Sequence, residues 1–157
     1  MSNNDPDEES ELLQQYKHFA STSNEVSNRR LKTNRFYVSL LSGILVVLPL
    51  VLDLDNLTDI RLVAILIIGF VGVVLCILWF FNILSYKQLN KGKYKVIHEM
   101  EEDLPYACFK REWEILGEGE DISRYITHWK VERLVPGMLA LPYLALMVFA
   151  LNRLFGC

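Results

Sequence analysis

The chain has 157 residues, of which 52% are hydrophobic, and its formal net charge is −3. Three long apolar runs occur within this length, which leaves too little polar chain to cover them inside a soluble fold. The composition argues against a soluble globular domain and predicts an all-α integral membrane protein with three transmembrane helices. No nucleic acid partner and no cofactor are expected.

The polar N-terminal region divides into a leader and a helix. Residues 1–11 are acidic and rich in Asn and Ser, which predicts a disordered leader. Apolar residues then recur at intervals of three and four, which predicts an amphipathic helix over residues 12–35 that runs into the first span. The stripe consists of Leu12, Tyr16, Phe19, Ser23 and Val26. This stripe needs a partner.

The three apolar runs are the predicted spans, over residues 36–52, 62–84 and 134–155. The second contains no charged side chain and exceeds the roughly 20 apolar residues that cross a bilayer. The first is short and contains Pro49, so a re-entrant or interfacial hairpin is the alternative there. Arg153 lies near enough to the end of the third run to reach the headgroups.

The distribution of Lys and Arg predicts the orientation. Five lie before the first run, one between the first and second, nine between the second and third, and one in the last turns of the third. Under the positive-inside rule this alternation predicts a cytoplasmic N terminus and a C terminus outside. A multi-pass protein of the bacterial cytoplasmic membrane is the expectation, with membrane lipids as its surroundings.

Residues 86–133, between the second and third spans, are predicted to form a small cytoplasmic block of helices. The second helix continues into this block and stops near Pro105, a short helix follows over 109–116, and another apolar stripe over 122–129 leads to the third span. The block is too small for a core of its own, so it should pack against the N-terminal helix or other copies. Trp113 and Trp129 are expected to lie in those contacts.

Four segments around this block carry a family resemblance. They are WFFNILSYKQLN (79–90), KYKVIHE (93–99), EDLP (102–105) and EWEILG (112–117). Together with the order of helices, they resemble the RipA-like family of small bacterial inner-membrane proteins. The resemblance implies a homo-oligomer, described for the family as an octamer, without an established enzymatic activity.

Small residues on the second span form a candidate oligomer interface. Gly69, Gly72 and Cys76 follow one another at steps of three and four, which would let a neighbouring backbone approach closely. Asn82 could hydrogen-bond between helices near the end of the span. The alternative for the small residues is packing within one chain. The alternative for Asn82 is hydration at the membrane–water interface.

Basic residues follow the second span. Lys87, Lys91 and Lys95 are spaced by four and line one helical face, with Lys93 beside them. Contact with anionic lipid is one interpretation. The alternative is a basic vestibule, repeated around an oligomer, that binds a soluble anionic ligand.

Catalytic and metal-binding patterns are sparse. His18, His98 and His128 are scattered over separate helices, and no glycine-rich phosphate loop occurs. The acidic run of Glu99, Glu101, Glu102 and Asp103 is interpreted as solvated. A non-enzymatic assembly with a cytoplasmic scaffold or interaction surface is therefore the first functional hypothesis, and a ligand-gated channel or membrane-disrupting effector is the alternative.

Overall fold

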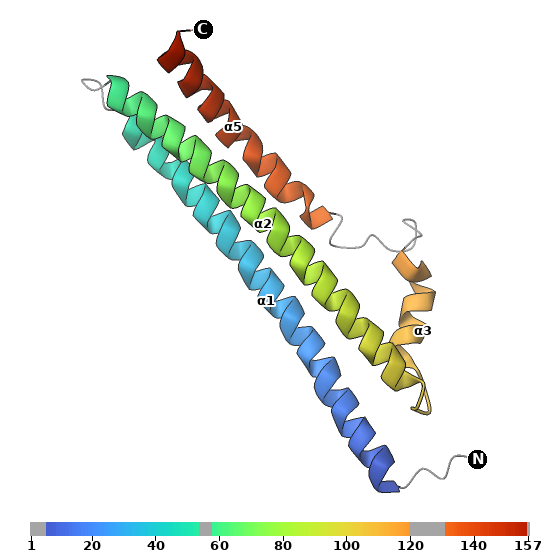
Figure 1. Cartoon of the computed structure of the whole chain (residues 1–157). Helices are drawn as coiled ribbons and strands as arrows, with labels where there is room; N and C mark the ends of the chain where they lie inside the picture. The colour runs from blue at the N-terminus through green and yellow to red at the C-terminus, as the bar shows by residue number, and fades with distance from the viewer. Residues whose placement is uncertain (1–5, 54–57, 120–130, 157) are drawn as a thin grey trace. The chain divides into compact units, whose positions relative to one another are not determined.

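The computed structural model describes residues 6–53, 58–119 and 131–156, and these segments are helical apart from short turns. The elements are α1 (Pro6–Leu52), α2 (Thr58–Glu101), α3 (Cys108–Ile115), the 3₁₀ turn η1 (Gly117–Gly119) and α5 (Leu134–Phe155) (Figure 1). No strand occurs within the described ranges. The all-α prediction is confirmed.

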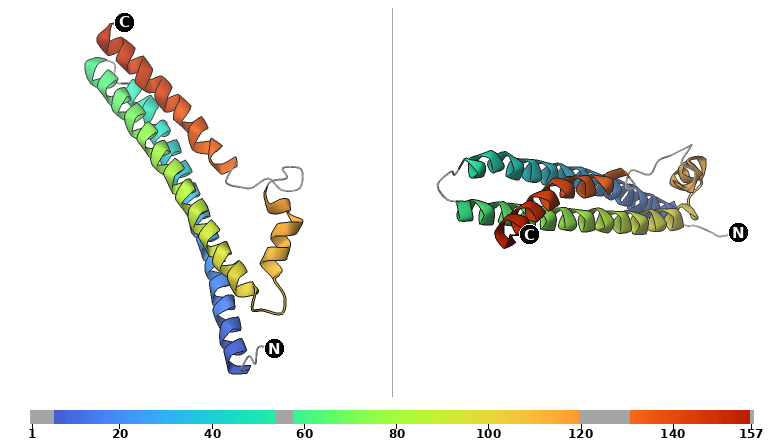
Figure 2. Two further views of the ribbon diagram at one scale, coloured as in Figure 1. Left: turned by 45° about the vertical axis from the view of Figure 1, so that its right-hand side comes forward. Right: turned by 90° about the horizontal axis from the view of Figure 1, so that it is seen from above.

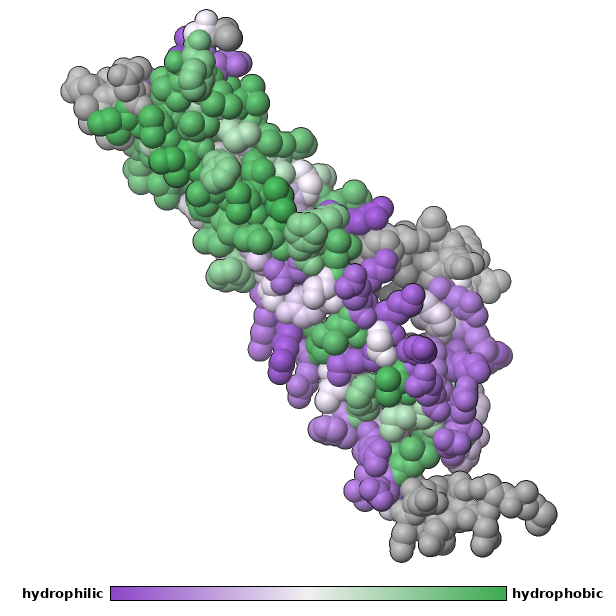
Figure 3. All heavy atoms as spheres, in the orientation of Figure 1, coloured by the Kyte–Doolittle hydropathy of each residue, from purple (hydrophilic) through white to green (hydrophobic). Residues whose placement is uncertain are grey.

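The chain divides into two compact units, which are described separately below. The polar unit consists of the described residues among 1–31 and 84–130, and the apolar unit of those among 32–83 and 131–157. Hydrophilic surface prevails over the polar unit and hydrophobic surface over the apolar unit (Figure 3). Both α1 and α2 contribute residues to each unit.

Helix α1 contains the predicted amphipathic helix and the predicted first span without a break, over 47 residues. It begins at Pro6, inside the segment for which disorder was predicted. Proline suits the first helical position because the N–H that it lacks would have no intrahelical partner there. The amphipathic helix thus starts earlier than its apolar stripe indicated.

Helix α2 continues past the predicted second span to Glu101, as the apolar pattern indicated. A turn follows, in which the Leu104 amide donates to the Glu101 carbonyl at 3.3 Å. Pro105 comes directly after this turn, which agrees with its predicted role as a helix stop. Helices α1, α2 and α5 are each long and apolar enough to cross a membrane, judged by length and composition.

The apolar unit consists of the C-terminal part of α1, the N-terminal part of α2, and α5. These three segments lie side by side in all views (Figure 2). Its core is formed by five buried side chains: Leu41, Cys76, Trp79, Ile83 and Tyr143. Each helix thus turns one face toward the other two and leaves the remainder of its apolar surface outward.

Some predictions fall outside the described residues. These are the apolar stripe over 122–129 with Trp129 and His128, and residues 1–5 of the leader.

Candidate functional site

A buried carboxylate holds the polar unit together. Glu101 is the last residue of α2, and its relative solvent-accessible surface is 2%. Its Oε1 accepts a hydrogen bond from the Tyr16 hydroxyl at 2.9 Å and one from the Phe109 amide at 2.7 Å, and its Oε2 accepts one from the Lys110 amide at 2.9 Å. A single side chain thus joins α1, α2 and α3. We call Glu101, Tyr16, Phe109 and Tyr94 the Glu101 cluster.

The carboxylate caps the N-terminus of α3. The first amides of a helix have no intrahelical acceptor, and the residue at the cap position, Ala107, has no side-chain acceptor to offer. Glu101 supplies that acceptor from another helix, and its negative charge lies at the positive end of the α3 dipole. An eight-residue helix is too short to be stable alone in water, so α3 depends on this contact.

Aromatic rings surround the carboxylate. The Phe109 ring lies edge-on to Tyr16 and to Tyr94, with centroids 6.1 Å apart in both pairs. Burial, and then the hydrogen bond to Glu101, raise the pKa of the Tyr16 hydroxyl, which therefore remains a donor. The prediction that the block packs against the N-terminal helix is confirmed for these residues.

The interpretation of Glu101 as part of a solvated acidic run is wrong. Glu102 and Asp103 are exposed, whereas Glu101 is buried. Its burial agrees with helical spacing, because Glu101 follows the buried Ile97 by four residues and so lies on the same face of α2. Its acidic neighbours led to the interpretation that Glu101 was solvated as well.

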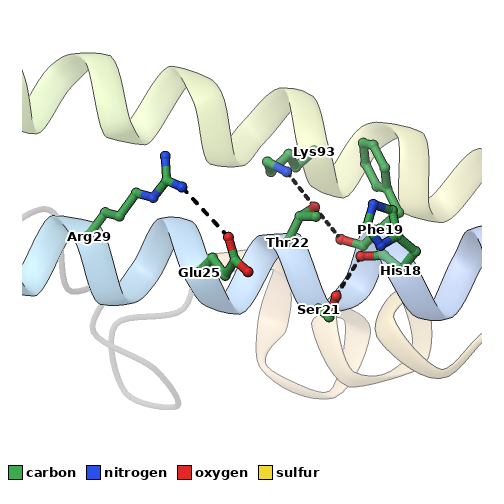
Figure 4. A network of polar contacts seen from close by, with 7 residues as sticks. All are labelled: His18, Phe19, Ser21, Thr22, Glu25, Arg29 and Lys93. Atoms are coloured by element: carbon green, nitrogen blue, oxygen red, sulfur yellow. Dashed lines mark hydrogen bonds and ion pairs between the residues drawn. The ribbon is translucent and has the colours of Figure 1, made fainter.

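The four lysines differ in exposure, and Lys87 is half-buried. Lys93 of α2 donates to the Thr22 hydroxyl of α1 at 2.6 Å, and its ammonium lies 4.8 Å from the centroid of the Phe19 ring (Figure 4). Lys91 and Lys95 are exposed, and Lys95 lies 3.9 Å from Glu99. Lys93 therefore fastens α2 to α1, while the spacing by four leaves Lys91 and Lys95 on the outer surface.

Two hydrogen bonds between side chains join α1 and α2 in the described part of the apolar unit. The Trp79 indole donates to Asn34 Oδ1 at 2.9 Å, and the Asn82 amide donates to the Tyr37 hydroxyl at 3.0 Å. The Tyr37 and Trp79 rings stack between them, 5.7 Å apart and 5° from parallel. Asn82 thus has a partner within its own chain, and its predicted role between subunits stays a prediction.

The small-residue face of α2 packs against α5 of the same chain. A Cβ placed on Gly72 would overlap the Tyr143 ring, and one on Gly69 would lie 2.9 Å from the Tyr143 carbonyl oxygen. The Tyr143 hydroxyl crosses to α1 and donates to the Leu41 carbonyl. Gly69, Gly72 and Cys76 are buried in this arrangement, which is the intrachain alternative. Nothing in the sequence pattern had singled out Tyr143.

Trp113 lies on α3, a helix that has no buried residue. Its side chain remains 39% exposed, so the contacts of one chain do not bury it as expected.

In the described ranges, no three His, Cys, Asp or Glu side chains lie close enough together to hold a metal ion. The cluster built around Glu101 positions helices and presents the surface of α3.

A three-helix apolar unit and a polar unit built on the same two long helices define a small multi-pass helical membrane protein. The family model of the octameric membrane protein family matches residues 13–152. The chain belongs to this family. The comparisons with curated proteins and with solved structures found no match.

Proposed function

We propose that this protein is a non-enzymatic subunit of a homo-octamer in the bacterial cytoplasmic membrane, and that its polar unit is a cytoplasmic scaffold or interaction surface. Family membership supports the octamer, and the alternation of Lys and Arg supports a cytoplasmic N terminus. The four segments between residues 79 and 117 support a relationship to the RipA-like family within this group.

One observation carries the proposal. Glu101 holds α3 by two hydrogen bonds from the Phe109 and Lys110 amides, yet α3 buries none of its own residues. A helix this short is not stable by itself in water. The chain therefore keeps α3 ordered although its surface faces outward, which suggests that this surface has a role. Recognition of another protein surface provides one, whereas catalysis would call for converging reactive groups.

A second candidate is a ligand-gated channel or membrane-disrupting effector. Lys91 and Lys95 are exposed on α2, and an oligomer would repeat them around its axis. An inward-facing ring of such residues would form a basic vestibule for a soluble anion. Anionic lipid would contact the same residues if the ring faced outward.

Native mass measurement of the protein in nanodiscs, followed by cryo-electron microscopy, tests both candidates. The scaffold proposal expects eight copies and a central region closed by apolar side chains. A stable monomer would overturn the assembly. A wide central path lined by the lysines, with anion-dependent conductance in planar bilayers, would favour the channel instead.

The proposed orientation has its own test. A reporter that is active only outside the cytoplasmic membrane should stay inactive when fused before Leu12 or after Gly117, and should be active after Cys157. Activity after Gly117 would overturn the assignment of the polar unit to the cytoplasm.

A further inference from the structure

A row of polar side chains lies on the outer face of α1, where the apolar unit begins. Its members follow one another at steps of three and four, and all are exposed: Lys32, Arg35, Ser39 and Ser42. Tyr37 and Leu41 of the same helix point toward the core of the apolar unit instead. The row therefore lies on a side of α1 that the described part of the chain leaves open.

The two cations of this row lack acidic partners. Among the described residues, no ion pair or hydrogen bond involves Lys32 or Arg35. Glu25 is the nearest acidic residue in α1, and it pairs with Arg29 at 3.7 Å (Figure 4). The ranges without any Asp or Glu are 26–52 in α1, 60–98 in α2 and 134–155 in α5. The positive charge of the row is thus not balanced by the helices of the apolar unit.

The order of side chains along the row matches the layers of a lipid leaflet. Phe36 is 61% and Val38 is 40% exposed beside the row, which provides apolar surface next to the cations. From Arg35 to Ser39 the helix rises about 6 Å, at 1.5 Å per residue. The headgroup layer on each side of the hydrocarbon core is about 5–7 Å thick. When Arg35 lies at the level of the phosphates, Ser39 therefore lies where the acyl chains begin.

The charge selects the kind of lipid. A guanidinium and an ammonium both donate charge-assisted hydrogen bonds to phosphate oxygens. A zwitterionic headgroup carries a cation of its own, which Lys32 and Arg35 would repel, whereas an anionic headgroup carries none. A second copy packed here through its spans would offer no acidic side chain and would bury the two cations uncompensated. Charge complementarity favours an anionic phospholipid over a neighbouring subunit.

We propose that Lys32 and Arg35 bind the phosphate of one anionic phospholipid, with the Ser39 hydroxyl at the level of its glycerol esters and Phe36 beside its acyl chains. The site lies on α1 and is separate from the lysines of α2. The inference goes beyond the proposed function, because it requires neither eight copies nor a particular orientation in the membrane.

A photoactivatable phosphatidylglycerol, with a diazirine close to the glycerol ester, tests where the lipid binds. The full chain is reconstituted in phosphatidylcholine vesicles that contain the probe, and the adducts are located by peptide mass spectrometry. We expect labelling concentrated between residues 32 and 42. Labelling confined to residues 87–95 of α2 would overturn the proposal, as would equal labelling by the corresponding phosphatidylcholine probe.

Neutral variants test which cations hold the lipid. Lys32→Gln and Arg35→Gln should each lower the affinity for phosphatidylglycerol about fivefold, as measured by native mass spectrometry during a lipid titration. Binding of phosphatidylcholine should not change. Arg29→Gln is the matched control, because it removes one exposed cation from the same helix that already has an acidic partner, and it should retain the affinity. An equal loss in the control would show that net charge decides binding, and would overturn the site.

A crosslinker on the row separates lipid from a second copy. Ser39 is replaced by p-benzoylphenylalanine, and the protein is irradiated in native membranes. We expect adducts with lipid. A crosslink to a second chain would assign this face to the subunit interface and overturn the lipid site, while the octamer would stand. A wild-type monomer that still binds phosphatidylglycerol through Lys32 and Arg35 would overturn the octamer alone.

Discussion

The two units fasten the same pair of helices by different means. In the apolar unit, α2 meets α5 at Gly69 and Gly72, where the lack of side chains lets Tyr143 approach the backbone. In the polar unit, a buried carboxylate gathers three donors and aromatic rings pack around it. In lipid no hydrophobic driving force brings helices together, so close contact between backbones becomes an important source of attraction. A buried carboxylate costs less free energy when several donors hydrogen-bond to it, as they do in the polar unit.

The two units should therefore be destabilised by different kinds of substitution. The apolar unit should be most sensitive to added volume, because its contacts are tight. The polar unit should be most sensitive to the loss of one acceptor, because several donors share it.

The largest effect is expected for Gly72→Leu. Its Cβ would overlap the Tyr143 ring, and overpacking of this kind typically costs about 1–3 kcal/mol, and more where neither partner can shift. We expect α5 to separate from α2, seen as a lower thermal midpoint in detergent and faster proteolysis at the α5 end. Gly137→Leu, at an open position of α5, serves as control. An unchanged midpoint would contradict the packing of Tyr143 on Gly72.

Glu101→Ala should have the next largest effect, confined to the polar unit. It removes the cap of α3 and leaves the Tyr16 hydroxyl without its acceptor, and a lost hydrogen bond to a charged group costs about 1.5–3 kcal/mol. Hydrogen exchange of the α3 amides should accelerate, while exchange in the apolar unit should not change. Glu102→Ala is the control, because Glu102 is exposed. Equal exchange in the two variants would refute the capping role.

Removal of one tyrosine hydroxyl from each unit sharpens the comparison. Tyr16→Phe breaks a bond to a carboxylate and should cost about 1.5 kcal/mol or more, since charge-assisted bonds are the stronger kind. Tyr143→Phe breaks a bond to a backbone carbonyl, and hydrogen bonds between membrane helices average about 0.6 kcal/mol. Urea or thermal titrations of both variants would measure the difference. A larger loss for Tyr143→Phe would reverse the contrast between the units.

The smallest effect is expected for Lys95→Ala. Lys95 and Glu99 form an exposed pair at adjacent turns of α2, and such pairs contribute about 0.3–0.5 kcal/mol. Lys93→Ala, by comparison, removes the bond to Thr22 and the contact with Phe19 and should destabilise the polar unit more. Equal thermal midpoints for the two variants would show that Lys93 is as peripheral as Lys95.

Several features followed from the sequence alone. Apolar runs fixed the number of candidate spans because the free energy of insertion depends on composition over about 20 residues. The spacing of Tyr16 and Phe19 placed an apolar stripe on α1 that needed a partner, since helical periodicity is a local property. Pro105 marked the region in which α2 stops.

The tertiary structure decided which surfaces meet. Glu101 lies within a run of acidic residues, and only the arrival of α3 and Tyr16 shows that it is an acceptor for three donors rather than a solvated charge. Gly72 was compatible with a neighbouring subunit or with packing within the chain, and in the structure the Tyr143 ring of α5 occupies the space beside it. Both outcomes depend on residues that are distant in sequence. The local pattern of apolar residues determines which face of a helix requires a partner. The packing of the whole chain determines which residues that partner supplies.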